Sequence, residues 1–341
     1  MDKVATMAVK DRMELFAETA ARKRLQVSLI EKDFWVCWSL GRLFSLPKQP
    51  ASMIFKGGTS LSKVFNVIRR FSEDVDLSLN REDLGFVGEK NPQEAPSGKK
   101  AQKLIAEISE TCKRVIREEL VPSIEESCAS IIGTPGDTWS IAIDEHDPQT
   151  VIFKYPRGGP AESSTERAYI QPAVRLELGA RSDHWPAEDH TVRSYAAEEF
   201  PALFEIPLVQ VRTLAAERTF WEKATILHAL HHRPIDQPLQ PRLARHYYDL
   251  AQLYASPIGD LALSDTDLLA SVVAHKRLFF PSGWANYDTA NPGTLKLLPP
   301  PQRQEEIAKD YAAMREMMFD DPPSLDEIFQ TLNTAEERIN G

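Results

Sequence analysis

The first part of the chain carries apolar side chains at the spacing of a helix. Leu15, Phe16 and Ala20 recur at helical intervals, and a more apolar segment runs from Val27 to Leu43. Apolar residues that return every three or four positions line one face of a helix. Residues 2–45 are therefore predicted to be helical, and Pro47 ends this region.

Between residues 53 and 79 the pattern changes twice. The apolar run Met53 to Phe55 can end a buried strand, two glycines follow, and a short helix is predicted at 62–70. The alternating segment Asp74-Val75-Asp76-Leu77-Ser78-Leu79 then predicts a strand. Because successive side chains of a strand point to opposite faces, Asp74 and Asp76 share one face.

The middle of the chain has a period of two, and the last part returns to helical spacing. Strands are predicted at 139–143, 150–155 and 173–178, which we expect to form a meander, and near 190–195. Helices are predicted at 101–120 and, after Pro207, at 209–232, 243–255, 264–280, 307–318 and 325–339, with an irregular proline-rich stretch at 281–301. This order favours an α+β core followed by an α-helical region. We expect the two domains at 1–205 and 206–341.

The composition narrows the classes of protein. Of 341 residues, 42% are hydrophobic and 26% are charged, as in a soluble globular protein. The chain has neither an apolar run of ~20 residues nor a signal pattern, so no membrane partner is expected. Three scattered cysteines favour a reducing, cytoplasmic location.

The formal charge of −10 argues against non-specific coating of nucleic acid, since that function requires a broad basic surface. Residues 206–250 are different, because they hold six Lys or Arg against four Asp or Glu, plus four His. A local contact with RNA therefore remains open.

Asp74 and Asp76 are the first candidates for chemistry. Two carboxylates on one face repel each other unless a cation lies between them, although a solvated edge strand is the ordinary alternative.

Upstream, Gly57 and Gly58 would let backbone amides approach a phosphate, with hydroxyls from Thr59 and Ser60 beside them. Arg69 and Arg70 could balance the charge of a triphosphate. The glycines fit neither the phosphate-loop nor the dinucleotide fingerprint. The pattern predicts a magnesium ion and a nucleotide phosphate.

Three later residues are weaker candidates. Glu177 shares a strand face with Arg175, which fits a surface ion pair, a third metal-binding carboxylate or a general base. Lys223 and Asp249 lie on predicted helices and would not be singled out by spacing alone. His228, His231 and His232 have helical spacing but no acidic or cysteine partner nearby, which disfavours zinc.

Together these segments resemble the nucleotidyltransferases of the AbiEii/AbiGii abortive-infection toxin family. The likeness is nearly end to end and rests on the segments 30–34, 55–61, 70–77, 174–177, 218–223, 245–250 and 310–317. It implies a polymerase-β-like nucleotidyltransferase core, a mixed sheet with flanking helices, and an α-helical C-terminal domain that completes the active site.

The resemblance also implies roles for individual residues. The metal, Mg²⁺ or Mn²⁺, would be held by Asp74, Asp76 and Glu177. These three, with Lys223 and Asp249, would be catalytic, and either Glu177 or Asp249 would be the base. The nucleotide would be bound by Lys56, Gly57, Gly58, Thr59, Ser60, Arg70, Ser72 and Lys223. Two departures stand out: many relatives have Asp where this chain has His246, and the third acidic residue is Glu rather than Asp.

Relatives of this kind act as toxins beside a separate antitoxin, and some transfer nucleotides to transfer RNA. The resemblance thus implies an enzyme that moves NMP from a nucleoside triphosphate to an RNA acceptor. The alternatives are a small-molecule or protein acceptor, or a non-catalytic relative that only binds a partner.

Overall fold

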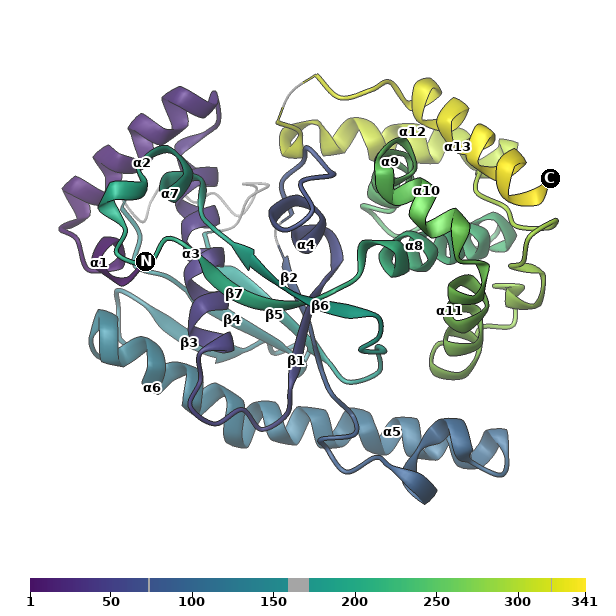
Figure 1. Ribbon diagram of the computed structural model, residues 1–341, viewed down its shortest axis with the longest axis horizontal. Helices are drawn as coiled ribbons and strands as arrows, with labels where there is room; N and C mark the ends of the chain where they lie inside the picture. The colour runs from purple at the N-terminus through teal and green to yellow at the C-terminus, as the bar shows by residue number, and fades with distance from the viewer. Residues whose placement is uncertain (73, 159–171, 320) are drawn as a thin grey trace. The chain divides into compact units, whose positions relative to one another are not determined.

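The computed structural model describes residues 1–72, 74–158, 172–319 and 321–341. They divide into two compact units, drawn as ribbons in Figure 1. The first unit comprises Met1–Val64, Ser72–Lys90 and Ala106–Thr213. The second comprises Phe65–Phe71, Asn91–Ile105 and Leu214–Gly341. Glu73, which belongs to one of the segments that carry the family likeness, lies outside the described residues.

A mixed sheet forms the centre of the first unit. Within the described residues it has seven strands in the order β3-β4-β5-β2-β1-β7-β6. The neighbours β3, β4 and β5 are antiparallel, so the predicted meander is confirmed. Strand β2 runs parallel to β5 and antiparallel to β1, and β1 is parallel to β7. The strands are β1 Met53–Lys56, β2 Asp74–Leu79, β3 Ser140–Ile143, β4 Thr150–Lys154, β5 Val174–Gly179, β6 Ala187–Val192 and β7 Val209–Leu214.

One face of this sheet is buried because a helix rich in aromatic side chains packs on it. Helix α3, Val27–Phe44, contributes Trp35 and Trp38, both fully buried. The Trp38 ring stacks on Phe153 of β4 with ring centroids 5.8 Å apart. Val75 of β2 and Leu176 of β5 lie opposite each other in register on the same face. Burial of this face leaves the alternate side chains of β2 and β5 on the other one.

The remaining helices of the chain flank the sheet or build the second unit. Among these, α4 is short, and α5 continues through a π-helical stretch, Ile116–Leu120, into α6, so the helix predicted at 101–120 is longer than expected. Ser324 caps α13 in a capping box with Glu327. The helices are α1 Asp2–Ala5, α2 Val9–Lys23, α4 Gly57–Lys63, α5 Gly98–Val115, α6 Val121–Ile132, α7 Tyr195–Glu199, α8 Ala216–His232, α9 Ala244–Ala255, α10 Pro257–Ser264, α11 Thr266–Phe279, α12 Gln304–Ala313 and α13 Leu325–Asn340.

Two predictions of secondary structure were wrong. Residues 209–232 are not one helix, because Val209–Leu214 form strand β7 before α8 begins. Buried Val209 and Val211 alternate there with the exposed residues Gln210 and Arg212, and this is the period of a strand. The helix predicted at 62–70 begins earlier and ends at Lys63; Asn66 then adopts a positive φ of 50°, and Arg70 forms a β-bridge with Met318.

The α+β class predicted from the sequence is confirmed by this mixed sheet and its helices. Among the described residues, no helix combines the length and the apolar character needed to cross a bilayer.

Candidate active site

The first group of predicted site residues lies on the open face of β2 and β5. The two strands are parallel, and their register pairs Asp74 with Arg175 and Asp76 with Glu177. On the other side of β2, Lys56 of β1 pairs with Asp76. All five residues are half-buried. Side chains at paired positions share a face, so the structure brings Asp74, Asp76 and Glu177 together on one side of the sheet.

Gly57 approaches this acidic face more closely than any other residue type could. Its φ is +77°, a conformation that favours glycine, and a Cβ added there would overlap the Asp76 carboxylate. Gly57 is also the first residue of α4. A glycine at this position therefore lets the start of α4 lie directly against Asp76.

The two hydroxyls that follow hold α4 in place. Thr59 donates from Oγ1 to the backbone carbonyl of Asp74 and, at 3.4 Å, to that of Ser72. Ser60 donates from Oγ to the carbonyl of Gly57 at 2.9 Å. Both Thr59 and Ser60 are buried. The Thr59 hydroxyl thus ties α4 to the start of β2, whereas the Ser60 hydroxyl is engaged within the first turn of α4.

A buried ion pair that sequence reasoning missed anchors the other end of α4. The Nζ of Lys63 lies 2.7 Å from Oδ1 of Asp33 in α3, and Oδ2 of Asp33 accepts the backbone N–H of Tyr195 at 2.7 Å. Burial opposes a charge on Lys63, but the Asp33 carboxylate together with Cys37 and Tyr195 outweighs it and raises the pKa of the lysine. The signal in the sequence was a carboxylate placed within the apolar segment Val27 to Leu43.

The second group of predicted residues meets inside the helical unit. Arg70 grips Asp249 with two hydrogen bonds, Nε to Oδ1 at 2.7 Å and Nη2 to Oδ2 at 2.8 Å. Lys223 of α8 donates to the same Oδ2 at 2.7 Å. All three side chains are buried, and Asp249 has no exposed surface. Asp249 thus has both oxygens in ion pairs.

The charges in this cluster shift the pKa values of its members. Burial alone would raise the pKa of Asp249, but the charges of Arg70 and Lys223 outweigh it and hold that pKa far below its usual range. Burial, helped by Arg70, lowers the pKa of Lys223, although Asp249 acts in the opposite direction. A carboxylate with so low a pKa is a poor acceptor of protons near neutral pH. Asp249 is better suited to holding Arg70 and Lys223 in position.

His246, the departure from the family pattern, is not a substitute for an acidic residue. Burial lowers its pKa well below the usual value, and the charges of Lys223 and Arg245 add to that effect. The imidazole is therefore neutral near pH 7. The buried carboxylate of this helix is Asp249.

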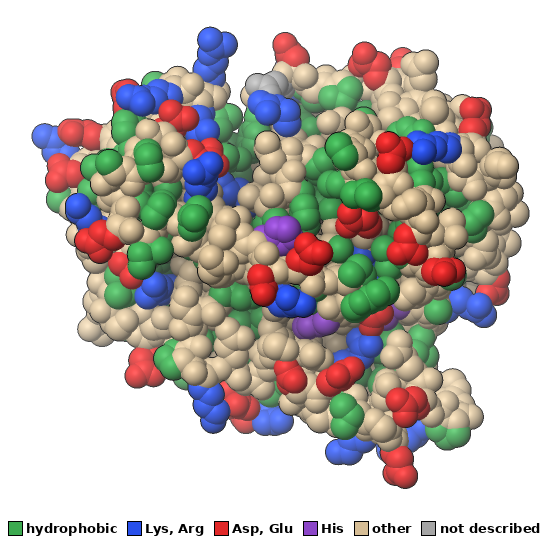
Figure 2. All heavy atoms as spheres, in the orientation of Figure 1, with side chains coloured by type: hydrophobic (Ala, Val, Ile, Leu, Met, Phe, Trp, Pro, Cys, Tyr) green, Lys and Arg blue, Asp and Glu red, His purple; other side chains and the backbone are tan. Residues whose placement is uncertain are grey.

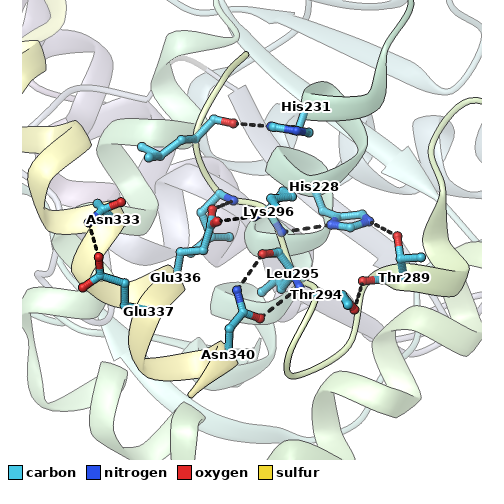
Figure 3. A network of polar contacts seen from close by, with 12 residues as sticks. His228, His231, Thr289, Thr294, Leu295, Lys296, Asn333, Glu336, Glu337 and Asn340 are labelled. Carbon is cyan, nitrogen blue, oxygen red and sulfur yellow. Dashed lines mark hydrogen bonds and ion pairs between the residues drawn. The ribbon is translucent and has the colours of Figure 1, made fainter. Parts of the chain in front are cut away.

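The histidines of α8 have structural contacts (Figure 3). His228 accepts the backbone N–H of Lys296 at Nδ1, 3.1 Å away, and its Nε2 lies 3.0 Å from the carbonyl oxygen of Asn286. Nδ1 of His231 lies 2.8 Å from the carbonyl oxygen of Leu298. These contacts attach the irregular segment 281–301 to α8.

The donor set on the acidic face fits a magnesium ion. Among the described residues, no group of three or more His, Cys, Asp or Glu side chains is arranged to enclose a metal. Magnesium, however, is usually held by one or two carboxylates while substrate phosphates and water complete its octahedron. Asp74 and Asp76 are hard oxygen ligands on one face, and Gly57 keeps space beside Asp76 free of a side chain. The residues present therefore suit a site that is completed by substrate.

Comparisons with curated sequences and with solved structures gave different results. No curated protein sequence matches the chain. Seven chains of solved structures do match. One is MenT4, a nucleotidyltransferase toxin from Mycobacterium tuberculosis H37Rv, with 16% identity, a TM-score of 0.43, and coverage of 94% of this chain and 98% of that one.

The family comparison is decisive because it spans both units. The model described as "Nucleotidyl transferase AbiEii toxin, Type IV TA system" matches residues 38–331, which include every site residue discussed above except Asp33. The chain belongs to the AbiEii family of nucleotidyltransferase toxins of type IV toxin–antitoxin systems.

Proposed function

We propose that this toxin is a magnesium-dependent enzyme that transfers a nucleoside monophosphate from a nucleoside triphosphate to a hydroxyl of RNA, transfer RNA among the candidates, and releases pyrophosphate. The observation that carries the proposal is the register of β2 and β5. It sets Asp76 beside Glu177 and puts Asp74 on the same face, with Gly57 against Asp76. The reaction would take place in the cytoplasm, where both substrates occur, and a separate antitoxin would counteract it.

Asp74 and Asp76 would hold the ion, Mg²⁺ or Mn²⁺. When bound, the ion supplies positive charge that offsets the charge of the triphosphate and of the departing pyrophosphate. The half-buried Lys56, paired in register with Asp76, adds a cation on the same face. Gly57 and Gly58 leave the backbone open to a phosphate, and Thr59 and Ser60 keep that backbone in place.

Glu177 is the carboxylate that would take the proton from the acceptor. The acceptor oxygen would then form a bond to the α-phosphorus while the bond to pyrophosphate breaks in line. Asp249 is less suited to this role, because both its oxygens are in ion pairs and its pKa is strongly lowered. We assign Asp249 the task of positioning Arg70 and Lys223, and Lys223 the nucleotide-binding role of the family's lysine motif.

RNA recognition would depend on local contacts rather than on a broad basic surface. On the face shown in Figure 2, Lys and Arg side chains are interspersed with Asp and Glu. The net charge of −10 also opposes long-range attraction of a phosphate backbone. The proposal therefore predicts selectivity for a particular RNA end or shape.

The test is transfer of label from each of the four α-³²P nucleoside triphosphates to total cellular RNA and to cellular protein, with and without Mg²⁺. Wild type should label RNA only with Mg²⁺, and the variant Asp74→Ala/Asp76→Ala should not label it. Asp189→Asn is a matched control, since Asp189 is an exposed carboxylate on β6 of the same sheet. Equal labelling by wild type and the double variant would refute the metal assignment. Label on protein alone would refute the RNA acceptor.

A further inference from the structure

Arg175 is a cation placed between two carboxylates on the acidic face. Its Nη1 donates to Oδ2 of Asp144 at 2.9 Å, and its Nε lies 3.6 Å from Oδ1 of Asp74. The side chain of Arg175 is 35% exposed, against 19% for Asp74 and 13% for Asp144. Arg175 also lies two positions before Glu177 on β5, so the two side chains share the face.

Asp144 is the fixed end of this bridge. Its Oδ1 accepts the backbone N–H of His146 at 2.8 Å and that of Asp147 at 3.3 Å, while its own N–H donates to the carbonyl of Thr150 at 2.8 Å. The His146 amide and the Arg175 guanidinium lower the pKa of Asp144. Because these hydrogen bonds fix the Asp144 carboxylate, the short contact anchors Arg175 on Asp144. The contact of Arg175 with Asp74 is longer and weaker.

We propose that Arg175 is a positioning residue that orients Asp74 in the absence of metal and yields it to the divalent cation while staying bonded to Asp144. The proposal rests on the proposed function, because it assumes that Asp74 binds the ion. A guanidinium and a divalent cation repel each other and therefore compete for the same carboxylate. The longer contact, to Asp74, is the one that gives way.

The two ends of the bridge should then affect metal binding in opposite directions. Removing the charge of Arg175 removes a competitor, so Arg175→Gln should bind the cation about threefold to tenfold more tightly. The same change loses the orientation of Asp74, so turnover at saturating metal should fall. Asp144→Asn frees Arg175 to pair with Asp74, and should weaken cation binding by about the same factor. A residue that only supported the fold would not produce opposite shifts.

The experiment titrates Mn²⁺ into nucleotide-free protein and follows the free ion by electron paramagnetic resonance. Label transfer over a range of Mg²⁺ concentrations gives the half-saturating concentration and the turnover separately.

Arg212 and Asp189 form a matched Arg–Asp pair on β7 and β6, 3.2 Å apart and exposed, so Arg212→Gln and Asp189→Asn are controls. Arg175→Lys keeps the charge and should bind Mn²⁺ nearly as wild type does. If Arg175→Gln does not fold, Asp144→Asn alone still tests the direction.

The outcomes separate this inference from the function on which it rests. Unshifted Mn²⁺ affinity in both Arg175→Gln and Asp144→Asn, or shifts in the same direction, would overturn the inference. If Asp74→Ala/Asp76→Ala meanwhile loses Mn²⁺ binding, the proposed function stands. If that double variant binds Mn²⁺ and labels RNA as wild type does, the proposed function itself fails.

Discussion

The two units of this protein each contain a group of carboxylates and cations, and the two groups differ in balance. In the helical unit one carboxylate, Asp249, is shared by two cations, Arg70 and Lys223, and is completely buried. On the sheet of the other unit Asp74, Asp76 and Glu177 are three half-buried carboxylates, and among the described residues Lys56 and Arg175 are the cations paired with them in register. In the helical unit the carboxylate is fully paired by cations of the protein, whereas on the sheet Asp74 and Asp76 are suited to a cation supplied from outside.

This difference indicates what each group is for. Buried charges must be paired, and once paired they form part of the fold. Carboxylates that are close together and partly open to water are a poor contribution to stability but a good site for a cation and its phosphates. Removing one carboxylate at a time tests this difference, because each variant can be assayed for loss of activity and for loss of stability.

Asp76→Asn should produce the largest effect, and on activity alone. Loss of a metal-binding carboxylate should lower turnover by at least about 1000-fold, since the charge that develops on the leaving group is no longer offset. The melting temperature should stay the same or rise, because repulsion among the carboxylates is reduced. Label transfer and thermal unfolding on the same preparation check both expectations. A large loss of stability would show that Asp76, like Asp249, stabilises the fold.

Asp249→Ala, unlike Asp76→Asn, should cause a large loss of stability. It leaves Arg70 and Lys223 buried without their carboxylate, a change that costs about 3–5 kcal/mol of folding free energy. Urea unfolding measures this loss. The triple change Arg70→Met/Lys223→Met/Asp249→Leu should restore much of the stability, because an apolar cluster of similar volume removes the unpaired charges. If Asp249→Ala were as stable as wild type but inactive, Asp249 would not stabilise the fold, and the contrast with Asp76 would be wrong.

The sequence predicts the acidic group better than the buried one for a physical reason. Alternation along β2 puts Asp74 and Asp76 on one face whatever lies beside the strand, so the local pattern was sufficient. The bond between Arg70 and Asp249 joins residues 179 positions apart and depends on how distant segments pack. The local sequence therefore does not reveal that Arg70 pairs with Asp249, and its role toward a triphosphate stays a prediction.

Local pattern also explains the error at β7. The alternation of Val209 and Val211 covers only six residues, and the helical run of α8 begins two residues later. So short a strand cannot be separated by periodicity from the helix that follows it. Pairing of Thr213 with Phe55 of β1 is a tertiary contact that single-sequence patterns do not contain.

Gly57→Ala should have an intermediate effect that touches the acidic group alone. The positive φ would strain the new side chain by about 1–3 kcal/mol, and its methyl would displace the Asp76 carboxylate. We expect weaker Mn²⁺ binding together with a lower melting temperature. Gly179→Ala is the control, because nothing lies within 4 Å of a Cβ built there on the neighbouring β5. Equal behaviour of the two variants would show that the contact of Gly57 with Asp76 has no consequence.

The smallest effect is expected at His228. Both nitrogens of its ring have hydrogen-bond partners, as both oxygens of Asp249 do. Burial lowers its pKa to about 4, and the neighbouring His231 and His232 act in the same direction while Asn286 and Glu336 oppose it. Between pH 6.5 and 4 the unfolded state therefore binds more protons than the folded one, so the free energy of unfolding falls as the pH is lowered. Between pH 6.5 and 5 the loss from this residue should be on the order of 2 kcal/mol. His228→Gln should be less stable than wild type at pH 7, because the Lys296 N–H loses its acceptor. At pH 5 the difference between their melting temperatures should shrink, and a constant difference would show that His228 does not cause the acid sensitivity.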